Sequence, residues 1–309
     1  MRTTAFTLIG SLLLTLTSIG RPYLKTSNDT SKLRDEDVVD TASRAKLISR
    51  QFSFTEGASV DKKGNVFFTD QNNNKIWEYD TNGKLTLFMD STGRSNGMYF
   101  DRKGNLVTCA DEHDELWSIS PKKRIEVILT NYQGHRLNGP NDLWIDDKGG
   151  IYFTDPYYQR PWWDRKTPDI KEQCVYYLSK GSKDPIQMIS DLQQPNGIVG
   201  TPDGKYLYVA DIKGNKTYRY AIGKDAGLTN KQLVIDQGSD GMTLDEKGNI
   251  YLTGRGVTVY NPAGKKIAHI DIPEKWTANL CFGGKNKDDL FITASEGIYI
   301  IHMKVQGVE

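Results

Sequence analysis

Polar turns followed by short runs of alternating apolar and polar residues recur along most of this 309-residue chain. Such alternation is typical of half-buried β-strands, and a Gly-containing turn before it is typical of a hairpin. The runs are DKKGNVFFTD (61–70), DRKGNLVTCAD (101–111), DDKGGIYFTD (146–155), TPDGKYLYVAD (201–211), DEKGNIYLTG (245–254) and NKDDLFITA (286–294). They are versions of one unit, so the pattern indicates an internal repeat.

Each unit also carries a strand before its turn, as in GMYFD and DLWID, and several carry a third and a fourth. Units of four strands, spaced by roughly forty to fifty-five residues, predict an all-β fold with six four-stranded blades, a six-bladed β-propeller. The last unit is one strand short. Residues 46–54 precede the first unit and are expected to supply that strand and close the ring, which leaves no open edge between first and last blades. A two-domain all-β protein is the competing architecture.

The N-terminal residues do not follow the repeat. Residues 1–20 hold one Arg and then a charge-free, largely apolar stretch, which predicts a signal peptide. Residues 21–44 are dense in charge, Ser and Thr and predict a polar linker, so the propeller domain is expected over 45–309. Export to the periplasm or the medium follows, with no membrane contact after signal removal; an uncleaved N-terminal anchor is the alternative.

The charge of the chain indicates its class of partner, and its cysteine count indicates the state of its thiols. The chain has 40 basic and 39 acidic residues mixed along its length, which argues against nucleic acid or an anionic membrane and favours a small molecule. Cys109, Cys174 and Cys281 are an odd count, so free buried thiols are expected. Nothing in the sequence indicates an oligomeric state.

Oxygen-bearing side chains occupy the same position in all six units, at the entry to the strand that lines the central channel. They are Glu56, Asn96, Asn141, Asn196, Asp240 and Asn279. Because the first strands of all blades converge on the axis, these side chains are expected to form a ring at the mouth of the channel. Asn and Asp also suit tight turns, and Gly follows four of the six, but Glu has no such preference.

A ring of carboxylate and amide oxygens is the donor set of a hard cation, so the sequence predicts a divalent cation here, with Ca²⁺ favoured and Mg²⁺, Mn²⁺ or Zn²⁺ possible. Two members, Glu56 and Asp240, are acids and would neutralise a divalent charge. Neither His nor Cys occupies this layer, which disfavours a soft metal.

Several motifs between Glu56 and Ile301 resemble those of the SMP-30/gluconolactonase family, which includes regucalcin and luciferin-regenerating enzyme. They are TEGASVD, RLNGPNDLWID, GIYFTDP, QPNGIV, SDGMTLDEKGN and CFGGKN. The resemblance implies a six-bladed propeller that hydrolyses a lactone ring, most simply a sugar lactone. It also implies that the metal ligands are Glu56, Asn141, Asn196 and Asp240, and that Asp240 acts on the attacking water or the substrate.

In the implied reaction the cation polarises the ester carbonyl while a carboxylate, Asp240 as first choice, positions or deprotonates the attacking water. The family's substrate-binding Arg lies two residues before the metal-binding Asn, where this chain has Gly139, so the identity of the lactone stays open. Two other functions also stay open on this fold. One is a binding propeller whose metal is only structural, and the other is an organophosphate or phosphotriester hydrolase at the same site.

The loop of the third unit, residues 156–173, is much longer than its counterparts and is expected to lie over the ring as a lid or specificity element. Four aromatic residues in it, Tyr157, Tyr158, Trp162 and Trp163, could stack on a sugar, although packing of the loop itself explains each one equally well. Arg160 or Arg165 could meet a carboxylate or a hydroxyl group.

Other candidate substrate-binding residues are two ring amides and three residues of neighbouring loops: Asn96, Asn279, His113, Arg136 and Arg255. For His113 and the two arginines, simple solvation is the alternative. Four acids that end second strands, Asp70, Asp111, Asp155 and Asp211, repeat blade by blade and are interpreted as structural turn residues.

Overall fold

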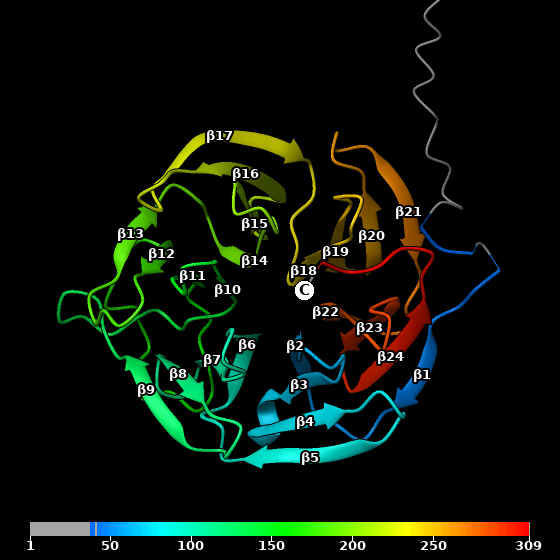
Figure 1. Ribbon diagram of the computed structural model, residues 1–309. Coiled ribbons are helices and arrows are strands. Elements are labelled where there is room, and N and C mark those ends of the chain that lie inside the picture. The colour runs from blue at the N-terminus through cyan, green and yellow to red at the C-terminus, as the bar shows by residue number, and fades with distance from the viewer. Residues whose placement is uncertain (1–37, 41, 309) are drawn as a thin grey trace, which may run out of the picture. The chain divides into compact units, whose positions relative to one another are not determined.

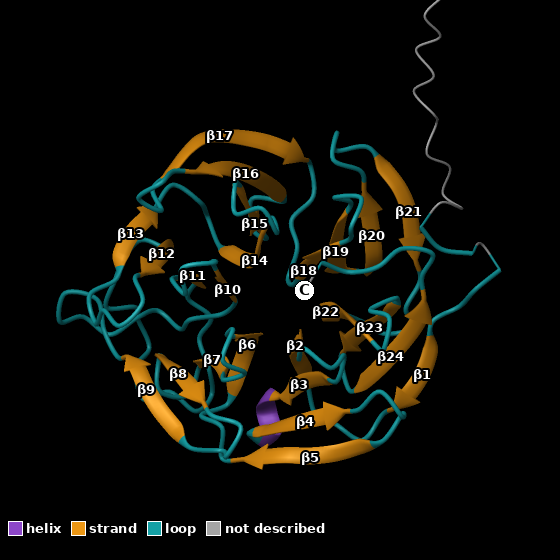
Figure 2. Cartoon of the chain, in the orientation of Figure 1, coloured by secondary structure: helices purple, strands orange, loops and turns teal. Residues whose placement is uncertain are grey.

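The computed structural model describes residues 38–40 and 42–308. Figure 1 shows six four-stranded antiparallel sheets arranged around a common axis, which confirms the all-β, six-bladed propeller. The strands dominate, and within the described ranges the one helical element is the 3₁₀ turn Gln71–Asn73, drawn in purple in Figure 2. No helix in the described part of the chain is long and apolar enough to cross a membrane. The predicted signal peptide lies outside the described residues.

Five blades are continuous in sequence, each running outward from the axis. Their strands are β2 to β5 (Thr55–Val60, Val66–Asp70, Lys75–Tyr79, Leu85–Asp90), β6 to β9 (Ser95–Phe100, Leu106–Ala110, Glu115–Ile119, Ile125–Leu129), β10 to β13 (Leu143–Ile145, Ile151–Asp155, Cys174–Leu178, Ile186–Ile189), β14 to β17 (Pro195–Gly200, Tyr206–Asp211, Lys216–Ile222, Leu228–Ile235) and β18 to β21 (Met242–Leu244, Ile250–Gly254, Gly256–Tyr260, Lys266–Ile270).

The sixth blade is completed by the N-terminal strand, as predicted. Its order is β1 (Lys46–Ser49), β24 (Gly297–His302), β23 (Asp289–Ala294) and β22 (Thr277–Gly283), and β1 runs antiparallel to β24 with Lys46 opposite Ile300. Arg50, just after β1, donates hydrogen bonds to Glu274 and to the Tyr299 hydroxyl, at 2.5 and 2.8 Å. Main-chain pairing and these side chains together close the circle of six blades.

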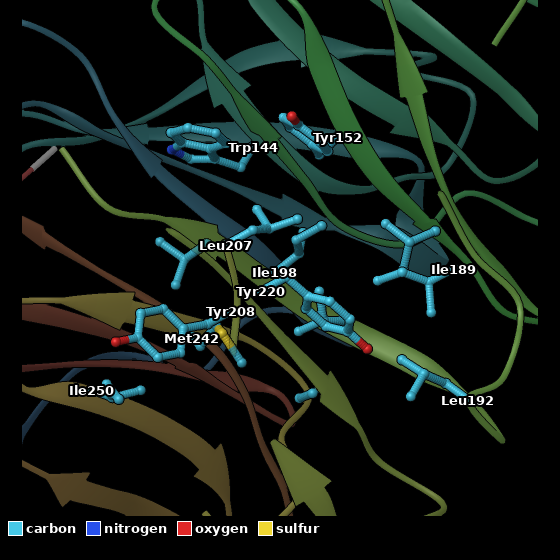
Figure 3. Close-up of a cluster of buried hydrophobic side chains, with 14 of the residues drawn as sticks. Trp144, Tyr152, Ile189, Leu192, Ile198, Leu207, Tyr208, Tyr220, Met242 and Ile250 are labelled. Atoms are coloured by element: carbon cyan, nitrogen blue, oxygen red, sulfur yellow. The ribbon is translucent and has the colours of Figure 1, made fainter. Parts of the chain in front are cut away.

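The hydrophobic core lies between neighbouring blades, because inner strands are covered on both faces. β2 and β14 are buried at every residue, whereas the outermost strand β5 has no buried residue. Figure 3 shows one such layer, in which side chains of the third, fourth and fifth blades interdigitate, among them Trp144, Ile198 and Met242. The three cysteines are free and buried, as expected.

The end of the predicted polar linker differs from expectation. Val38 and Val39 are 0% and 8% exposed and pack into the core between the fifth and sixth blades. The Val38 carbonyl also accepts a hydrogen bond from the Lys304 amide at 2.9 Å. Two apolar residues among charges give no periodic signal, so the sequence could not reveal that they dock on the propeller.

We expect Val38→Ser to lower the free energy of unfolding by about 2–3 kcal/mol, because it removes buried apolar surface and buries a hydroxyl group. Ala42→Ser, at an exposed position of the same segment, should leave stability unchanged. Thermal or urea unfolding of the two variants measures the difference. Equal stabilities would mean that the segment does not dock in solution.

Candidate active site

The six ring residues lie at or just before the first strand of each blade, next to the axis. Five of them are buried, with 2–7% of each residue exposed, and Asp240 is partly buried: Glu56 and Asn96 are second in β2 and β6, Asn196 is second in β14, Asn279 is third in β22, and Asn141 and Asp240 stand two residues before β10 and β18. In Figure 1 these six strands are the innermost of the propeller. The six residues thus share one structural layer.

Glycine is needed after several ring residues because the inner turns of neighbouring blades lie too close together to admit a side chain. A Cβ on Gly97 would lie 2.6 Å from the carbonyl oxygen of Asn141, and one on Gly197 would lie 2.5 Å from that of Asp240. Gly97 N also donates to the Asn141 carbonyl at 2.7 Å. Neither glycine has a positive φ, so the reason for them is close approach of neighbouring blades, and not the turn chemistry considered from the sequence.

The two acids of the ring interact with each other. Burial raises the pKa of Glu56 well above its usual range, and the charge of Asp240 adds to this rise. Burial also raises the pKa of Asp240 to about 6, against hydrogen bonds from Trp276 and Asn196 and the charge of Arg160, which lower it. The Trp276 indole N–H donates to Oδ2 of Asp240 at 2.6 Å. Two carboxyl groups that repel each other, one buried and one partly buried, are a site for positive charge.

The side-chain amide of Asn196 donates a hydrogen bond through its nitrogen, but its oxygen accepts none from the described residues. Its Nδ2 donates to the Tyr158 hydroxyl at 3.0 Å, whereas its buried Oδ1 has no hydrogen-bond partner among the described residues. An unpaired buried carbonyl oxygen is costly unless a cation or water meets it. This oxygen, with the carboxylates of Glu56 and Asp240, is a donor set that fits a hard divalent cation.

Three of the four acids that end second strands fix the loop leading to a ring residue. Asp155 accepts hydrogen bonds from the amides of Asn138 and Gly139, both at 2.9 Å, just before Asn141. Asp70 and Asp211 do the same for residues 53–54 and 193–194. Their interpretation as structural residues agrees with these contacts.

Asp111, the fourth of these acids, differs. In the second blade the corresponding amide of Arg94 donates instead to the side chain of Asn74 at 2.7 Å, and the amide of Thr92 donates to the same side chain at 2.8 Å. Asp111 forms an ion pair with Arg160 of the long loop, with Nε 3.1 Å from Oδ2. Burial raises its pKa to about 6, and Arg160 opposes the rise. The sequence repeat hid this exception, because Asp111 matches its counterparts by position.

The long loop of the third blade, residues 156–173, is anchored beside the ring. Trp163 is buried, donates to the Asp111 carbonyl at 2.7 Å, and packs so closely on Gly139 that a Cβ there would lie 2.7 Å from its ring. Arg165 is also buried and pairs with Asp114 at 2.6 Å. These two side chains hold the loop in place, so Arg165 is not available to a substrate.

Tyr158 and Arg160 are the loop residues that reach the ring. Tyr158 contacts Asn196 as described above, and Arg160 lies close enough to lower the pKa of both Glu56 and Asp240. The Arg160 guanidinium also lies 5.4 Å from the Tyr158 ring and 5.7 Å from the Trp162 ring. The loop thus places one guanidinium group and two aromatic rings beside the ring residues.

The other predicted substrate residues lie in different surroundings. His113 is exposed and stacks on Trp117 at 5.4 Å, and Arg136 pairs with exposed Asp164 at 3.0 Å. Tyr157 donates to Gln159 within the loop at 2.7 Å. None of these contacts joins the ring, and they favour the structural alternatives for all three residues.

Arg255 lines a separate cavity of about 290 Å³ together with Trp276, the residue that holds Asp240. Among the ring amides, Asn279 Oδ1 accepts the Leu280 amide at 2.8 Å. Asn96 is buried, and its main-chain carbonyl oxygen faces Gly57. Trp276 itself was missed, since KWTAN has no repeat or motif signal at that position.

A second group of possible metal ligands, Asp288, Asp289 and His302, brings its ligand atoms within 4.8 Å of one another at the sixth blade. His302 is exposed and lies 3.1 Å from Asp289, so these side chains already pair with each other. The group includes no ring residue.

The structure is a six-bladed propeller with a ring of carboxylate and amide side chains next to its axis. The chain belongs to the SMP-30/gluconolactonase/LRE-like family, whose model matches residues 54–296. It is 28% identical to gluconolactonase of Zymomonas mobilis, over 89% of this chain and 85% of that one, and 26% identical to lactonase drp35 of Staphylococcus haemolyticus, over 71% and 69%. A solved gluconolactonase from Xanthomonas campestris has the same fold, with a TM-score of 0.79 and 24% identity over 84% and 90% of the chains.

We expect Gly97→Ala to lower the free energy of unfolding by about 1–3 kcal/mol, because the new methyl group would push two inner turns apart. Gly227→Ala is a matched control, since its Cβ would lie 3.2 Å from the nearest atom, the end of the Asp225 side chain. Chemical denaturation compares the two. A Gly97 variant as stable as the control would show that the turns can separate freely.

Proposed function

We propose that this protein is a lactone hydrolase whose centre is a divalent cation, most simply Ca²⁺, held by Glu56, Asn141, Asn196 and Asp240. The observation that carries the proposal is a pair of mutually repelling acids, Glu56 buried and Asp240 partly buried, beside Oδ1 of Asn196, which has no hydrogen-bond partner among the described residues. Membership of the family and the lactonase names of its relatives support the same reaction class. The substrate we propose is a sugar lactone.

The reaction adds water across the ester of the ring. The water oxygen bonds to the carbonyl carbon, the bond from that carbon to the ring oxygen breaks, and one proton passes to the released hydroxyl group. When bound, the cation supplies Lewis-acid polarisation of the carbonyl and makes a coordinated water more acidic. The chain's own residues must orient the water, accept its proton and hold the substrate.

Asp240 is the residue we assign to the water. The Trp276 indole holds Oδ2, so the carboxylate cannot rotate freely and its other oxygen keeps a fixed direction. A general base needs such a position before it needs a matched pKa. Glu56 receives the Gly57 amide on Oε2 at 3.1 Å and is assigned as a ligand.

Two other functions predict different behaviour. In a binding propeller the ring would stabilise the fold without turnover, and in a phosphotriester hydrolase a P=O group would take the place of the carbonyl. The buried acid pair is compatible with both, but the lactonase relatives favour the lactone.

Hydrolysis of glucono-δ-lactone tests the proposal directly. After treatment with EDTA, the purified chain should show only the spontaneous rate, and Ca²⁺ or another divalent cation should restore turnover. A panel of lactones and a phosphotriester should be assayed in parallel. Thermal stabilisation by Ca²⁺ without turnover of any of these substrates would favour the binding propeller.

We expect Asp240→Asn to reduce lactone hydrolysis by about 10²–10⁴-fold, because the base is lost while the shape of the side chain is kept. Asp236→Asn makes the same charge change at an exposed position four residues away and should retain full activity. Circular dichroism should show that both variants keep the fold. Undiminished hydrolysis by the Asp240→Asn variant would assign the base elsewhere.

The Glu56→Gln variant tests whether the ring binds the cation, independently of any measurement of hydrolysis. Wild-type protein should gain thermal stability on addition of Ca²⁺, since a ligand that binds only the folded state stabilises it. The variant should lose most of this gain because one ring charge is gone. Glu78→Gln, outside the ring on β4, is the control. A full Ca²⁺ shift in the Glu56→Gln variant would place the cation away from the ring.

A further inference from the structure

Arg160 has side-chain donors near the ring that form no hydrogen bond with any described residue. Its Nε pairs with Asp111, at 3.1 and 3.4 Å from the two carboxylate oxygens. No described residue accepts a hydrogen bond from its two terminal nitrogens, and the side chain is 19% exposed. A guanidinium group held at one end therefore presents two free nitrogens in a fixed plane, the geometry that receives two oxygens at once.

The orientation of this guanidinium group is set by Asp111, which is 2% exposed. Asp111 is free to do so because Asn74, and not Asp111, fixes the loop that leads to Asn96. Two aromatic rings border the same group, Tyr158 and Trp162, and Arg94 lies 4.7 Å from the Trp162 ring. Each neighbour restricts the rotation of Arg160, so its free nitrogens are preorganised.

The charge at the mouth indicates what these nitrogens bind. Arg160 and Asp111 neutralise each other, and a divalent cation would neutralise Glu56 and Asp240. Asp142 adds a negative charge near Glu56. The balance does not favour an anionic ligand, whereas hydroxyl oxygens of a neutral molecule can accept both hydrogen bonds without a charge cost.

We propose that Arg160, positioned by Asp111, binds two neighbouring hydroxyl groups of the substrate and so selects polyhydroxylated lactones over unsubstituted ones. The inference rests on the proposed lactonase function for its kinetic test, and it adds the residue that defines the substrate class. Arg160 contacts the substrate, while Asp111 acts through Arg160 and is a positioning residue.

Kinetics with two lactones tests the selection. Arg160→Met should raise KM for glucono-δ-lactone by about 10- to 100-fold, the value of hydrogen bonds to a charged group, and should change KM for δ-valerolactone less than about two-fold. Arg160→Lys keeps the charge without the planar fork and should show an intermediate KM. Arg124→Met, at an exposed position of the second blade, should match the wild type for both lactones.

Asp111→Asn tests the positioning role. It should raise KM for glucono-δ-lactone in the same direction as Arg160→Met and leave kcat for δ-valerolactone unchanged, and the double variant should be no worse than Arg160→Met alone. A merely structural defect would lower activity toward both lactones together. Equal losses for both lactones in the Arg160 variants, or no loss at all, would overturn the proposal.

Binding of 1,5-anhydroglucitol separates this proposal from the reaction, since this ring carries neighbouring hydroxyl groups and no ester. Calorimetric titration should show binding to the wild type and at least about ten-fold weaker binding to Arg160→Met. If the wild type binds the probe in this way but hydrolyses no lactone, the proposed reaction is wrong and the hydroxyl site stands. If lactones are hydrolysed and both proteins bind the probe equally, the hydroxyl site is wrong and the reaction stands.

Discussion

The structure depends on how closely six inner turns approach one axis. Main chain meets main chain there, as where Gly97 N donates to the Asn141 carbonyl and Gly241 N to that of Ala278, both at 2.7 Å. Backbone atoms carry these contacts, although the side chain of Asn279 also packs on the turn at Gly241. The identity of the other ring side chains is then free to serve chemistry, which explains why acids and amides can be buried at the centre of the fold.

The same separation of roles extends outward to the loops. Three second-strand acids hold the turns that lead to the ring, and in the second blade Asn74 performs this task in place of Asp111. The released carboxylate orients Arg160, and the long loop that carries Arg160 rests on Gly139, where a side chain would collide with Trp163. Because Asn74 supports the turn before Asn96, Asp111 can pair with Arg160 while that turn stays fixed.

The sequence predicts those features that repeat. Strand alternation and turns give the six blades, and equivalent positions give the ring from Glu56 to Asn279, because both follow from local periodicity. The linker end at Val38, the indole of Trp276 on Asp240 and the pair of Arg160 with Asp111 were not found. Each depends on where a non-repeating segment crosses another blade, and side-chain partners between segments 36 or 49 residues apart leave no local pattern.

Completion of the sixth blade by β1 has a consequence for how the chain is made. The strand Lys46–Ser49 is synthesised long before its partner Gly297–His302, because the other five blades lie between them in the sequence. Until that partner is made, β1 has unpaired backbone groups and the first blade has an uncovered side. Pairing across this distance is slow to form, and exposed strand edges of this kind invite association with other chains. A chain that is interrupted before Gly297 lacks the partner of β1 and so cannot complete the sixth blade.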